Sequence, residues 1–125
     1  MIFLQGFTLL EVLISLLLFS LILLGFEDMQ IVALKNARAA NYFYLATEQM
    51  HNITERLKLL SNQHGLHQQI IQWNNENQQV LPAGRGLSVG QYPHYTLTLY
   101  WGNFNKKCDT IYLGQAGCIA NNLYL

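Results

Sequence analysis

The sequence predicts an α+β fold in which a long N-terminal helix packs, through its second half, against a small antiparallel β-sheet. Three observations lead to this prediction: an apolar run from Phe7 to Phe26, a stripe of apolar residues at helical spacing after it, and a late segment, "HYTLTLYWG", in which apolar and polar residues alternate. A period near 3.6 indicates helix and a period of 2 indicates strand, so the helical part precedes the sheet in the chain.

The composition bounds the domain count and the classes of partner. The chain has 125 residues, which suits one domain. Seven Lys and Arg balance seven Asp and Glu, so the chain lacks the excess of one charge that is typical of proteins that bind nucleic acids or anionic lipids. We therefore expect no nucleic acid among its partners.

The apolar run from Phe7 to Phe26 is long enough to cross a membrane, because about 20 helical residues span about 30 Å, the thickness of the hydrocarbon core. A secretory signal peptide would show a basic start, a shorter apolar centre and a small-x-small cleavage site, none of which "MIFLQG" or "GFEDMQ" provides. A soluble core helix that is apolar on all faces would be unusual in so small a chain. A membrane-spanning helix is the favoured interpretation.

Glu11 is an ionisable residue inside this run. At the centre of a bilayer such a side chain costs about 2.5 to 3.5 kcal/mol. One explanation is that Glu11 lies near the helix end and that its carboxylate reaches the interface. The other rests on the whole string "GFTLLEVLISLLLF", in which Gly6, Phe7, Thr8 and Glu11 stand at the start of a continuous apolar helix.

This string resembles the start of type IV pilins and of the pseudopilins of type II secretion systems, whose processing signal is a glycine, an aromatic residue or Met, and a Thr-Leu-x-Glu start. The resemblance implies that a prepilin peptidase cuts after Gly6 and methylates the new amino group of Phe7. It assigns Thr8 and Glu11 to subunit assembly, with Glu11 neutralising the terminal ammonium of a neighbouring subunit. Opposite charges that are costly in lipid become less costly when they pair.

The same resemblance implies an organisation and a location. Residues 1–6 would be the prepilin leader, residues 7–26 the transmembrane and assembly helix, and residues 27–125 a periplasmic pilin head. The protein would span the bacterial inner membrane once, with its C-terminal head in the periplasm, and would be incorporated into a surface pilus. Its implied partners are the prepilin peptidase, other minor and major pilins and the inner-membrane assembly platform.

One feature departs from the family pattern. The leader carries no Lys or Arg before Gly6, although such residues help to keep this end of the chain in the cytoplasm. Either the amino group of the start residue suffices, or the true start lies upstream of Met1. The departure concerns topology and leaves the cleavage motif intact.

Between Glu27 and Leu60 the helical pattern continues as an apolar stripe. Its members recur at spacings of four and three: Ala39, Phe43, Ala46, Met50, Ile53, Leu57 and Leu60. A coiled coil shares this spacing, but the small alanines and the single short run favour packing against a local domain. We expect "SNQHG" to stop the helix, with Gly65 as a left-handed cap.

The segment after this stop is rich in Gln and Asn, and its apolar residues predict a short amphipathic helix or a turn-rich connector. Proline and glycine residues then mark a transition to strands. In "HYTLTLYWG" we expect one face to carry Tyr95, Leu97, Leu99 and Trp101, and the other Thr96, Thr98 and Tyr100. With "GLSVG", "TIYLG" and "IANNLYL" as further candidates, we expect three or four antiparallel strands packed on the helical stripe.

More narrowly, the chain resembles minor pilins of the PilV group, the type IV pilus modification proteins. The resemblance runs through "LLGFEDMQIVALKNARAANYFYLATEQMHNITERLK", a Trp followed by "LPAGRG", and "YTLTLYW". It covers most of the chain. It implies a minor type IV pilin that helps to initiate or modify pilus assembly.

Cys108 and Cys118 enclose "DTIYLGQAG". A metal site would need more ligands at closer spacing, and the nearest histidine, His94, stands alone. A disulfide is the favoured interpretation, because the periplasm is oxidising and closing a loop of about 11 residues stabilises a fold by about 3 kcal/mol. The alternative is a pair of free buried thiols.

The sequence offers little support for catalysis, and we expect neither an enzyme nor a cofactor or metal. It contains no Ser-His-Asp pattern, and the Gly-rich "AGRGLSVG" precedes a strand instead of opening a helix. Three functions of different classes remain: a minor type IV pilin, a minor pseudopilin of a type II secretion system, and a DNA-uptake pilin. For the last, Lys106 and Lys107 beside Trp101 and Phe104 are a hint.

Overall fold

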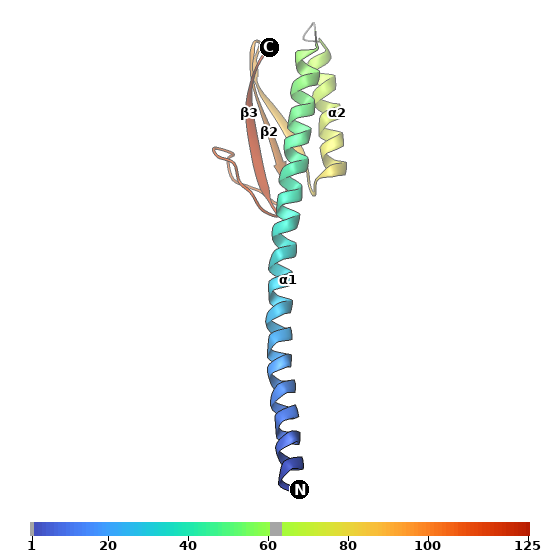
Figure 1. The fold of residues 1–125 in the computed structure, drawn as a ribbon. Helices are drawn as coiled ribbons and strands as arrows, with labels where there is room; N and C mark the ends of the chain where they lie inside the picture. Colours follow the sequence, from blue (N-terminus) through green and yellow to red (C-terminus); the bar gives the residue numbers. More distant parts are fainter. Residues whose placement is uncertain (1, 61–63) are drawn as a thin grey trace. The chain divides into compact units, whose positions relative to one another are not determined.

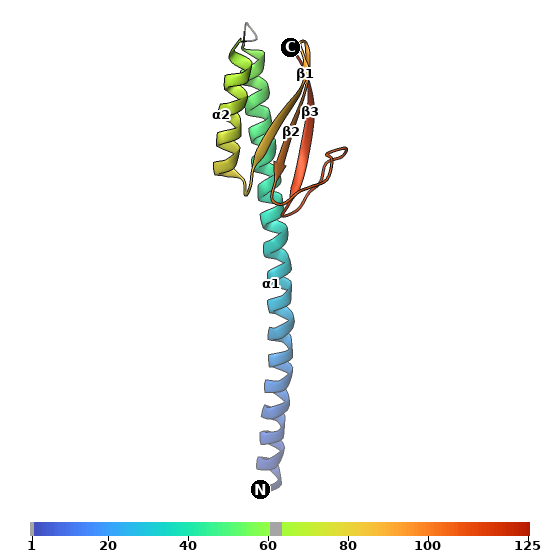
Figure 2. The same cartoon turned by 180° about the vertical axis from the view of Figure 1, so that it is seen from behind.

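A computed structural model of the chain describes residues 2–60 and 64–125, with side chains from Thr8 to Leu60 and from Gly65 to Leu125. The chain divides into two compact units, Met1–Lys35 and Asn36–Leu125. We call the first the N-terminal unit and the second the head unit. The described elements are two helices followed by three strands, which confirms the predicted α+β class (Figures 1 and 2).

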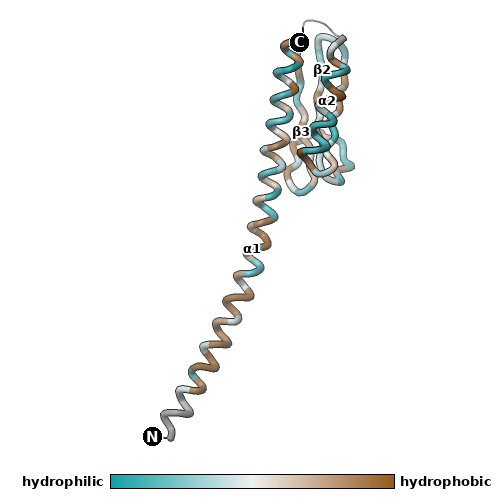
Figure 3. Tube along the Cα trace, turned by 90° about the vertical axis from the view of Figure 1, so that its right-hand side faces the viewer, coloured by the Kyte–Doolittle hydropathy of each residue, from teal (hydrophilic) through white to brown (hydrophobic). Residues whose placement is uncertain are grey.

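Helix α1 extends from Ile2 to Lys58. Its sequence is rich in strong helix formers such as Leu and Ala and contains no proline. Figure 3 shows mainly hydrophobic colours over the coloured part of the N-terminal unit and mixed colours over the part of α1 that belongs to the head unit. Arg56 and Lys58 occupy the last turn, where positive charge interacts favourably with the helix dipole.

The prediction of a left-handed cap at Gly65 is wrong. Helix α2 (His64–Val80) already includes Gly65 in its first turn, and the φ angle of Gly65 is not in the left-handed region. An added Cβ at this glycine would lie 3.0 Å from a methyl carbon of Leu60, so close packing rather than handedness favours a small residue here. Residues 61–63 of the predicted stop lie outside the described residues.

The Gln- and Asn-rich segment forms helix α2, which confirms the predicted amphipathic helix over the turn-rich connector. The helix lies beside the C-terminal part of α1 (Figures 1 and 2). Trp73 is fully buried, and its indole nitrogen donates a hydrogen bond to the backbone carbonyl of Gln49 at 3.1 Å. Arg56 and Glu76 form an ion pair of 3.0 Å between the two helices. These contacts make α2 part of the head unit's core.

The sheet contains β1 (Arg85–Gln91), β2 (His94–Trp101) and β3 (Gly117–Tyr124) in the order β1-β2-β3, and both pairs are antiparallel. The predicted alternation in β2 is confirmed. Leu97, Leu99 and Trp101 are fully buried, whereas Thr96 and Thr98 are half-buried on the other face. Because side chains alternate between the two faces of a strand, the alternating pattern correctly predicted which face of β2 is directed toward α1.

The prediction of a strand at "TIYLG" is wrong. The segment contributes a single bridge, between Tyr112 and Cys118. The segment lies inside the loop closed by Cys108 and Cys118, ten positions apart, and the chain must turn back between Tyr112 and Cys118. Cys108 and Tyr112 both lie beside Cys118, so the residues between them cannot continue as an extended strand along β3. The sheet therefore has three strands, the lower of the two predicted numbers.

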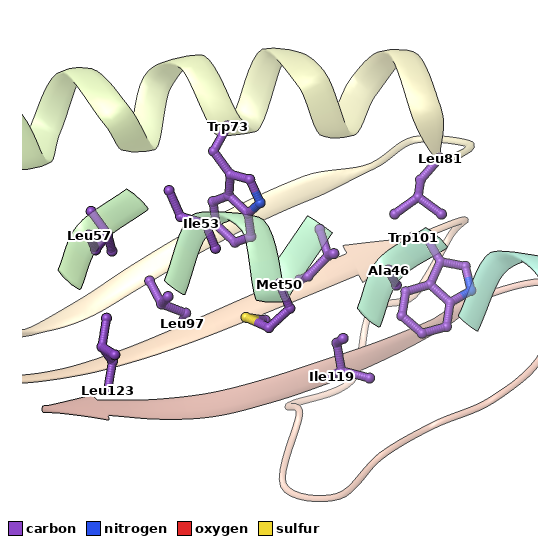
Figure 4. Packing of buried hydrophobic residues seen from close by; sticks show 11 residues of the cluster. Ala46, Met50, Ile53, Leu57, Trp73, Leu81, Leu97, Trp101, Ile119 and Leu123 are labelled. Atoms are coloured by element: carbon purple, nitrogen blue, oxygen red, sulfur yellow. The ribbon is translucent and has the colours of Figure 1, made fainter. Parts of the chain in front are cut away.

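The core of the head unit lies between the sheet and the two helices. Figure 4 shows side chains of the apolar stripe of α1 directed toward β2 and β3. The buried cluster contains Ala46, Met50, Ile53, Leu57, Trp73, Leu81, Leu97, Leu99, Trp101, Ile119 and Leu123. Since the stripe packs on a sheet of its own head unit, the interpretation as a core face is confirmed over the coiled-coil alternative. Phe43 and Leu60 pack against this cluster as half-buried residues.

Candidate functional site

The predicted processing site lies in the first turns of α1. The backbone of Gly6 and Phe7 is helical. Their side chains lie outside the described residues, so the assignment of cleavage to Gly6 and Phe7 and of methylation to Phe7 stays a prediction. The description of side chains begins at the next residue, Thr8.

Glu11 lies on the same face of α1 as Thr8 and Ser15. These three polar residues line one shallow groove together with Val12, Leu16 and Phe19. Their spacings of three and four place them one above another on the helix. The Ser15 hydroxyl donates a hydrogen bond to the backbone carbonyl of Glu11 at 2.8 Å. The Glu11 side chain is exposed and takes no part in this bond. Within the described residues, none of the ion pairs includes Glu11.

The apolar residues of the N-terminal unit are exposed. The large apolar side chains from Leu9 to Leu34 range from 46% exposed at Leu23 to 69% at Met29. By length and composition, α1 is able to cross a membrane, and the described residues contain one such helix. An apolar surface of this extent on a monomer requires lipid or other protein to cover it.

Residues 5–26 match the family profile of the prokaryotic N-terminal methylation motif. The chain carries a pilin-type processing signal. This match confirms the coarser part of the predicted resemblance, because the matched segment contains Gly6, Phe7 and Glu11. Neither the curated proteins nor the solved structures contain a match to the chain.

The methylation motif supports a type IV pilin-like or pseudopilin protein and points to a structural subunit rather than an enzyme. A signal of this type implies processing by a prepilin peptidase and assembly with other pilins. Together with the long apolar helix, it indicates membrane anchoring. The matched segment ends at residue 26, before the head unit begins.

Cys108 and Cys118 form a disulfide in the head unit. Cys118 is fully buried in β3, and Cys108 lies in the loop before it. Tyr112, inside the closed loop, exchanges two backbone hydrogen bonds with Cys118 at 3.1 and 3.2 Å. The disulfide and this bridge together hold the loop against the sheet.

The two aromatic residues named beside Lys106 and Lys107, Trp101 and Phe104, are not available to stack on bases. Trp101 is fully buried in the core, and Phe104 is 8% exposed. Lys107 pairs with Asp109 at 3.7 Å, and both side chains are largely exposed. Base stacking requires accessible aromatic faces beside the positive charge. The hint toward a DNA-uptake pilin therefore finds no support at these residues.

The titratable side chains of the described residues do not converge on a reactive centre. No group of three or more His, Cys, Asp or Glu in this part of the chain could hold a metal ion. His51, His67 and His94 are exposed, and the ring of His94 packs against Tyr124 with a centroid distance of 4.8 Å. Lys58 and Glu55 form an exposed pair on α1 at 3.3 Å.

Sequence reasoning missed several polar contacts that assemble the head unit. Asn74 of α2 accepts a hydrogen bond from the backbone nitrogen of Gly86 at 2.9 Å. Arg85 donates to the Phe104 carbonyl at 2.6 Å and lies over the ring of Tyr100. A single sequence carries no signal for such long-range contacts, because neither partner by itself indicates the other.

Proposed function

We propose that this chain is a minor type IV pilin, a structural subunit that helps to initiate or modify pilus assembly. The observation that carries the proposal is the position of the methylation motif at the start of an exposed apolar helix, which continues into a small α+β head unit. A filament subunit needs these parts: a processing signal, an apolar helix that other subunits or lipid cover, and a head that remains soluble.

In this proposal the leader comprises residues 1–6, the transmembrane and assembly helix residues 7–26, and the periplasmic head residues 27–125. Cleavage after Gly6 creates a new amino terminus at Phe7, which then receives a methyl group. The cleaved chain spans the inner membrane once until it is incorporated into a surface pilus. The assembly platform of the inner membrane and the other minor and major pilins are its partners.

Glu11 is the proposed assembly contact inside the membrane. An exposed carboxylate in an apolar helix is costly in lipid and gains when a cation approaches it. The ammonium group of Phe7 in a neighbouring subunit would supply that cation, since the neighbouring subunit is also anchored in the membrane before assembly. The groove that Glu11 shares with Thr8 and Ser15 places small polar side chains around the pairing position.

A periplasmic head is supported by the disulfide. Disulfides persist in the oxidising periplasm and are rare in the cytosol. Cys108 and Cys118 are bonded to each other, and both lie in the head unit. The head unit would therefore fold and oxidise on the far side of the membrane from the uncleaved leader.

Deletion of the gene tests the proposal when surface pili and secreted proteins are counted in the same strain. We expect pili to fall and secretion to remain normal, and we expect a plasmid copy of the gene to restore the pili. Lost secretion with normal pili would instead identify the minor pseudopilin of a type II secretion system. Normal pili together with normal secretion would contradict both functions.

A further inference from the structure

The outward face of the sheet carries an open groove near the turn that joins β1 to β2. Its volume is about 690 Å³, within the range of about 300 to 1,000 Å³ that small-molecule sites occupy. All of its lining residues belong to the head unit. The groove shares no residue with the processing motif or with the groove of Glu11, so the function proposed above does not use it.

Six side chains on this face line the groove: Val89, Gln91, His94, Thr96, Asn122 and Tyr124. They form two rows across the sheet, because the three residues of each row are direct partners in the strand register. Side chains alternate between the two faces of a strand. Leu97, which follows Thr96 in β2, is fully buried in the core that Figure 4 shows, so the two rows are directed away from the core.

A hydrogen bond within the groove orients a polar side chain. The Thr96 hydroxyl donates to the side-chain oxygen of Asn122 at 2.9 Å. This bond occupies the amide oxygen and leaves the two N–H donors of the amide nitrogen for another partner. Among the residues that the structure describes, no hydrogen bond uses that nitrogen. Since the Thr96 oxygen is still able to accept, the pair offers donors and an acceptor side by side.

An exposed aromatic ring lies in the same groove. Tyr124 is 69% exposed, and its ring packs against the ring of His94 with a centroid distance of 4.8 Å. This contact restricts the Tyr124 ring and leaves most of its surface in water. On β1, Val89 is 68% exposed. The groove therefore combines apolar surface with neutral hydrogen-bonding groups, which suits a ligand that has both on one molecule.

The charge of the lining limits the class of ligand. None of the lining residues is Lys, Arg, Asp or Glu. Arg85, Lys106 and Lys107 line a different groove of the head unit. A nucleic acid requires cations beside its phosphates, so a base that stacked on Tyr124 would leave its backbone without a charge partner here. Charge complementarity thus favours an uncharged ligand.

We propose that this groove binds a neutral saccharide, which adds a binding activity to the structural role of the head. Sugar hydroxyls both donate and accept hydrogen bonds, and they match the amides of Asn122 and Gln91 and the oxygen of Thr96. The C–H groups on one face of a sugar ring form an apolar surface that packs on the exposed ring of Tyr124.

Other uncharged ligands fit the groove less well. The face of a sheet presents side chains, whereas the backbone N–H and C=O groups point along the sheet toward neighbouring strands. A peptide in the groove would therefore find no backbone partners for its own amides, and an unpaired amide is costly once it is buried. A wholly apolar ligand would cover the Asn122 nitrogen without bonding to it. A saccharide meets neither obstacle.

Binding of the full chain to an array of oligosaccharides tests the inference. The chain is purified in a detergent without a sugar headgroup, because such a headgroup would compete for the groove. The array carries neutral oligosaccharides of glucose, galactose, mannose and N-acetylglucosamine, their sialylated and sulfated forms, uncharged peptides and single-stranded DNA. We expect binding to at least one neutral oligosaccharide, and at least about tenfold weaker binding to its acidic forms. Isothermal titration calorimetry with that oligosaccharide gives its Kd.

Two matched pairs of substitutions locate the binding. Tyr124→Ala removes the ring, and Tyr44→Ala is its control, because Tyr44 on α1 is 66% exposed and lies outside the groove. Asn122→Ala removes the amide donors, and Asn121→Ala is its control at an exposed neighbour outside the groove. Tyr124→Ala and Asn122→Ala should each raise the Kd about tenfold, and the two controls should leave it unchanged. Formation of the head's disulfide, checked on non-reducing gels, shows that each variant folds.

Each contrary result overturns a stated part of the inference. No binding with a Kd below about 1 mM to any neutral oligosaccharide overturns it entirely. Stronger binding to the acidic forms or to DNA overturns the choice of a neutral ligand. A peptide that binds and is lost in Tyr124→Ala and Asn122→Ala assigns the groove to a peptide instead. Saccharide binding that both of these variants keep places the site elsewhere and overturns the groove.

The inference and the proposed function fail separately. A chain that is cleaved and enters pili but binds no saccharide loses the inference and keeps the function. A chain that binds a neutral saccharide in this groove, and whose deletion leaves both pili and secretion normal, keeps the inference and loses the function.

Discussion

The backbone of Gly86 in β1 lies directly against the indole ring of Trp73 in α2: a Cβ added at Gly86 would be 2.2 Å from the Cζ3 atom of the ring. Trp73 is fully buried and cannot move away without disturbing the core. The absence of a side chain at position 86 therefore sets the distance between the edge of the sheet and α2.

Gly86→Ala tests this packing. We expect the substitution to lower the free energy of unfolding of the head by about 1 to 3 kcal/mol, because overpacking forces the strand or the indole to shift. The change in the free energy of unfolding is measured by denaturant unfolding of the full chain in detergent, with tryptophan fluorescence as the signal. Gly25→Ala is the control, since an added Cβ at Gly25 meets nothing within 4 Å. Equal unfolding midpoints for the two variants would contradict the packing argument.

Asn77 has a fully buried amide whose nitrogen and oxygen both lack a hydrogen-bond partner among the described residues. A buried polar group without a partner costs about 1 to 3 kcal/mol. Asn77→Leu keeps the branched shape of the side chain and removes both unpaired polar atoms, so it should raise the free energy of unfolding by about 1 to 2 kcal/mol. Chemical denaturation of the full chain measures the change.

Asn74→Leu is the matched control for that prediction, because Asn74 lies on the same helix and accepts the hydrogen bond from Gly86. This variant should lose about 1 kcal/mol of stability. A stability loss in Asn77→Leu comparable to that in Asn74→Leu would mean that the Asn77 amide has a partner such as a buried water.

The processing prediction concerns Gly6. The mature protein should begin at Phe7 with a methylated amine, because the glycine is the residue whose small size suits the peptidase at this boundary. Gly6→Leu should leave unprocessed precursor in the inner membrane, whereas Gly25→Leu in the same helix should be cleaved normally. Intact-mass measurement of the purified chains shows whether each one is cleaved and methylated. A mature chain that begins after Phe26 would restore the interpretation as a secretory signal peptide.

Glu11→Ala should separate membrane insertion from assembly. Removing the carboxylate removes the cost of a charge in lipid, so the variant should insert well and be cleaved after Gly6. It should be recruited poorly, and the number of surface pili should fall toward that of the deletion strain. Ser20→Ala is the control, because Ser20 lies on the same helix but outside the groove of Glu11, and it should keep normal pili. Normal incorporation of Glu11→Ala would mean that the carboxylate only reaches the interface.

The disulfide prediction tests the compartment as well as the bond. Cys108 and Cys118 in periplasmic extracts should resist alkylation until a reductant is added. Replacement of both cysteines by alanine should lower the stability of the head by about 3 kcal/mol, because the bond no longer restricts the unfolded chain. Thermal unfolding with and without reductant measures this loss. Rapid labelling of both thiols in untreated extracts would place the head in a reducing compartment.

Much of the fold was predictable because its signals are local. The alternation in β2 repeats over several residue pairs, and the stripe from Ala46 to Leu57 repeats over several helical turns. The apolar face of β2 and the apolar stripe of α1 are both buried, as predicted. The processing motif was also readable, because a peptidase recognises a contiguous stretch of chain. The match to residues 5–26 concerns the same stretch.

Other features were not predictable from the sequence. Gly65 and the segment around Tyr112 carried signals for a cap and for a strand, and tertiary context overrode both. Gly65 became part of the first turn of α2, and at Tyr112 the deciding factor was the short disulfide-closed loop. Local propensity is worth a fraction of a kcal/mol per residue, less than such packing and closure constraints.

The sequence by itself determined the long helix, the stripe that packs in the head, the central strand and the processing motif, because hydrophobic periodicity and contiguous motifs need no distant partner. Only the tertiary structure decided that Asn74 of α2 bonds to Gly86 at the edge of β1, and that the Asn77 amide is buried without a partner among the described residues. Exposure of an edge or isolation of an amide depends on what the rest of the chain brings beside it, and that information exists only after the segments have packed.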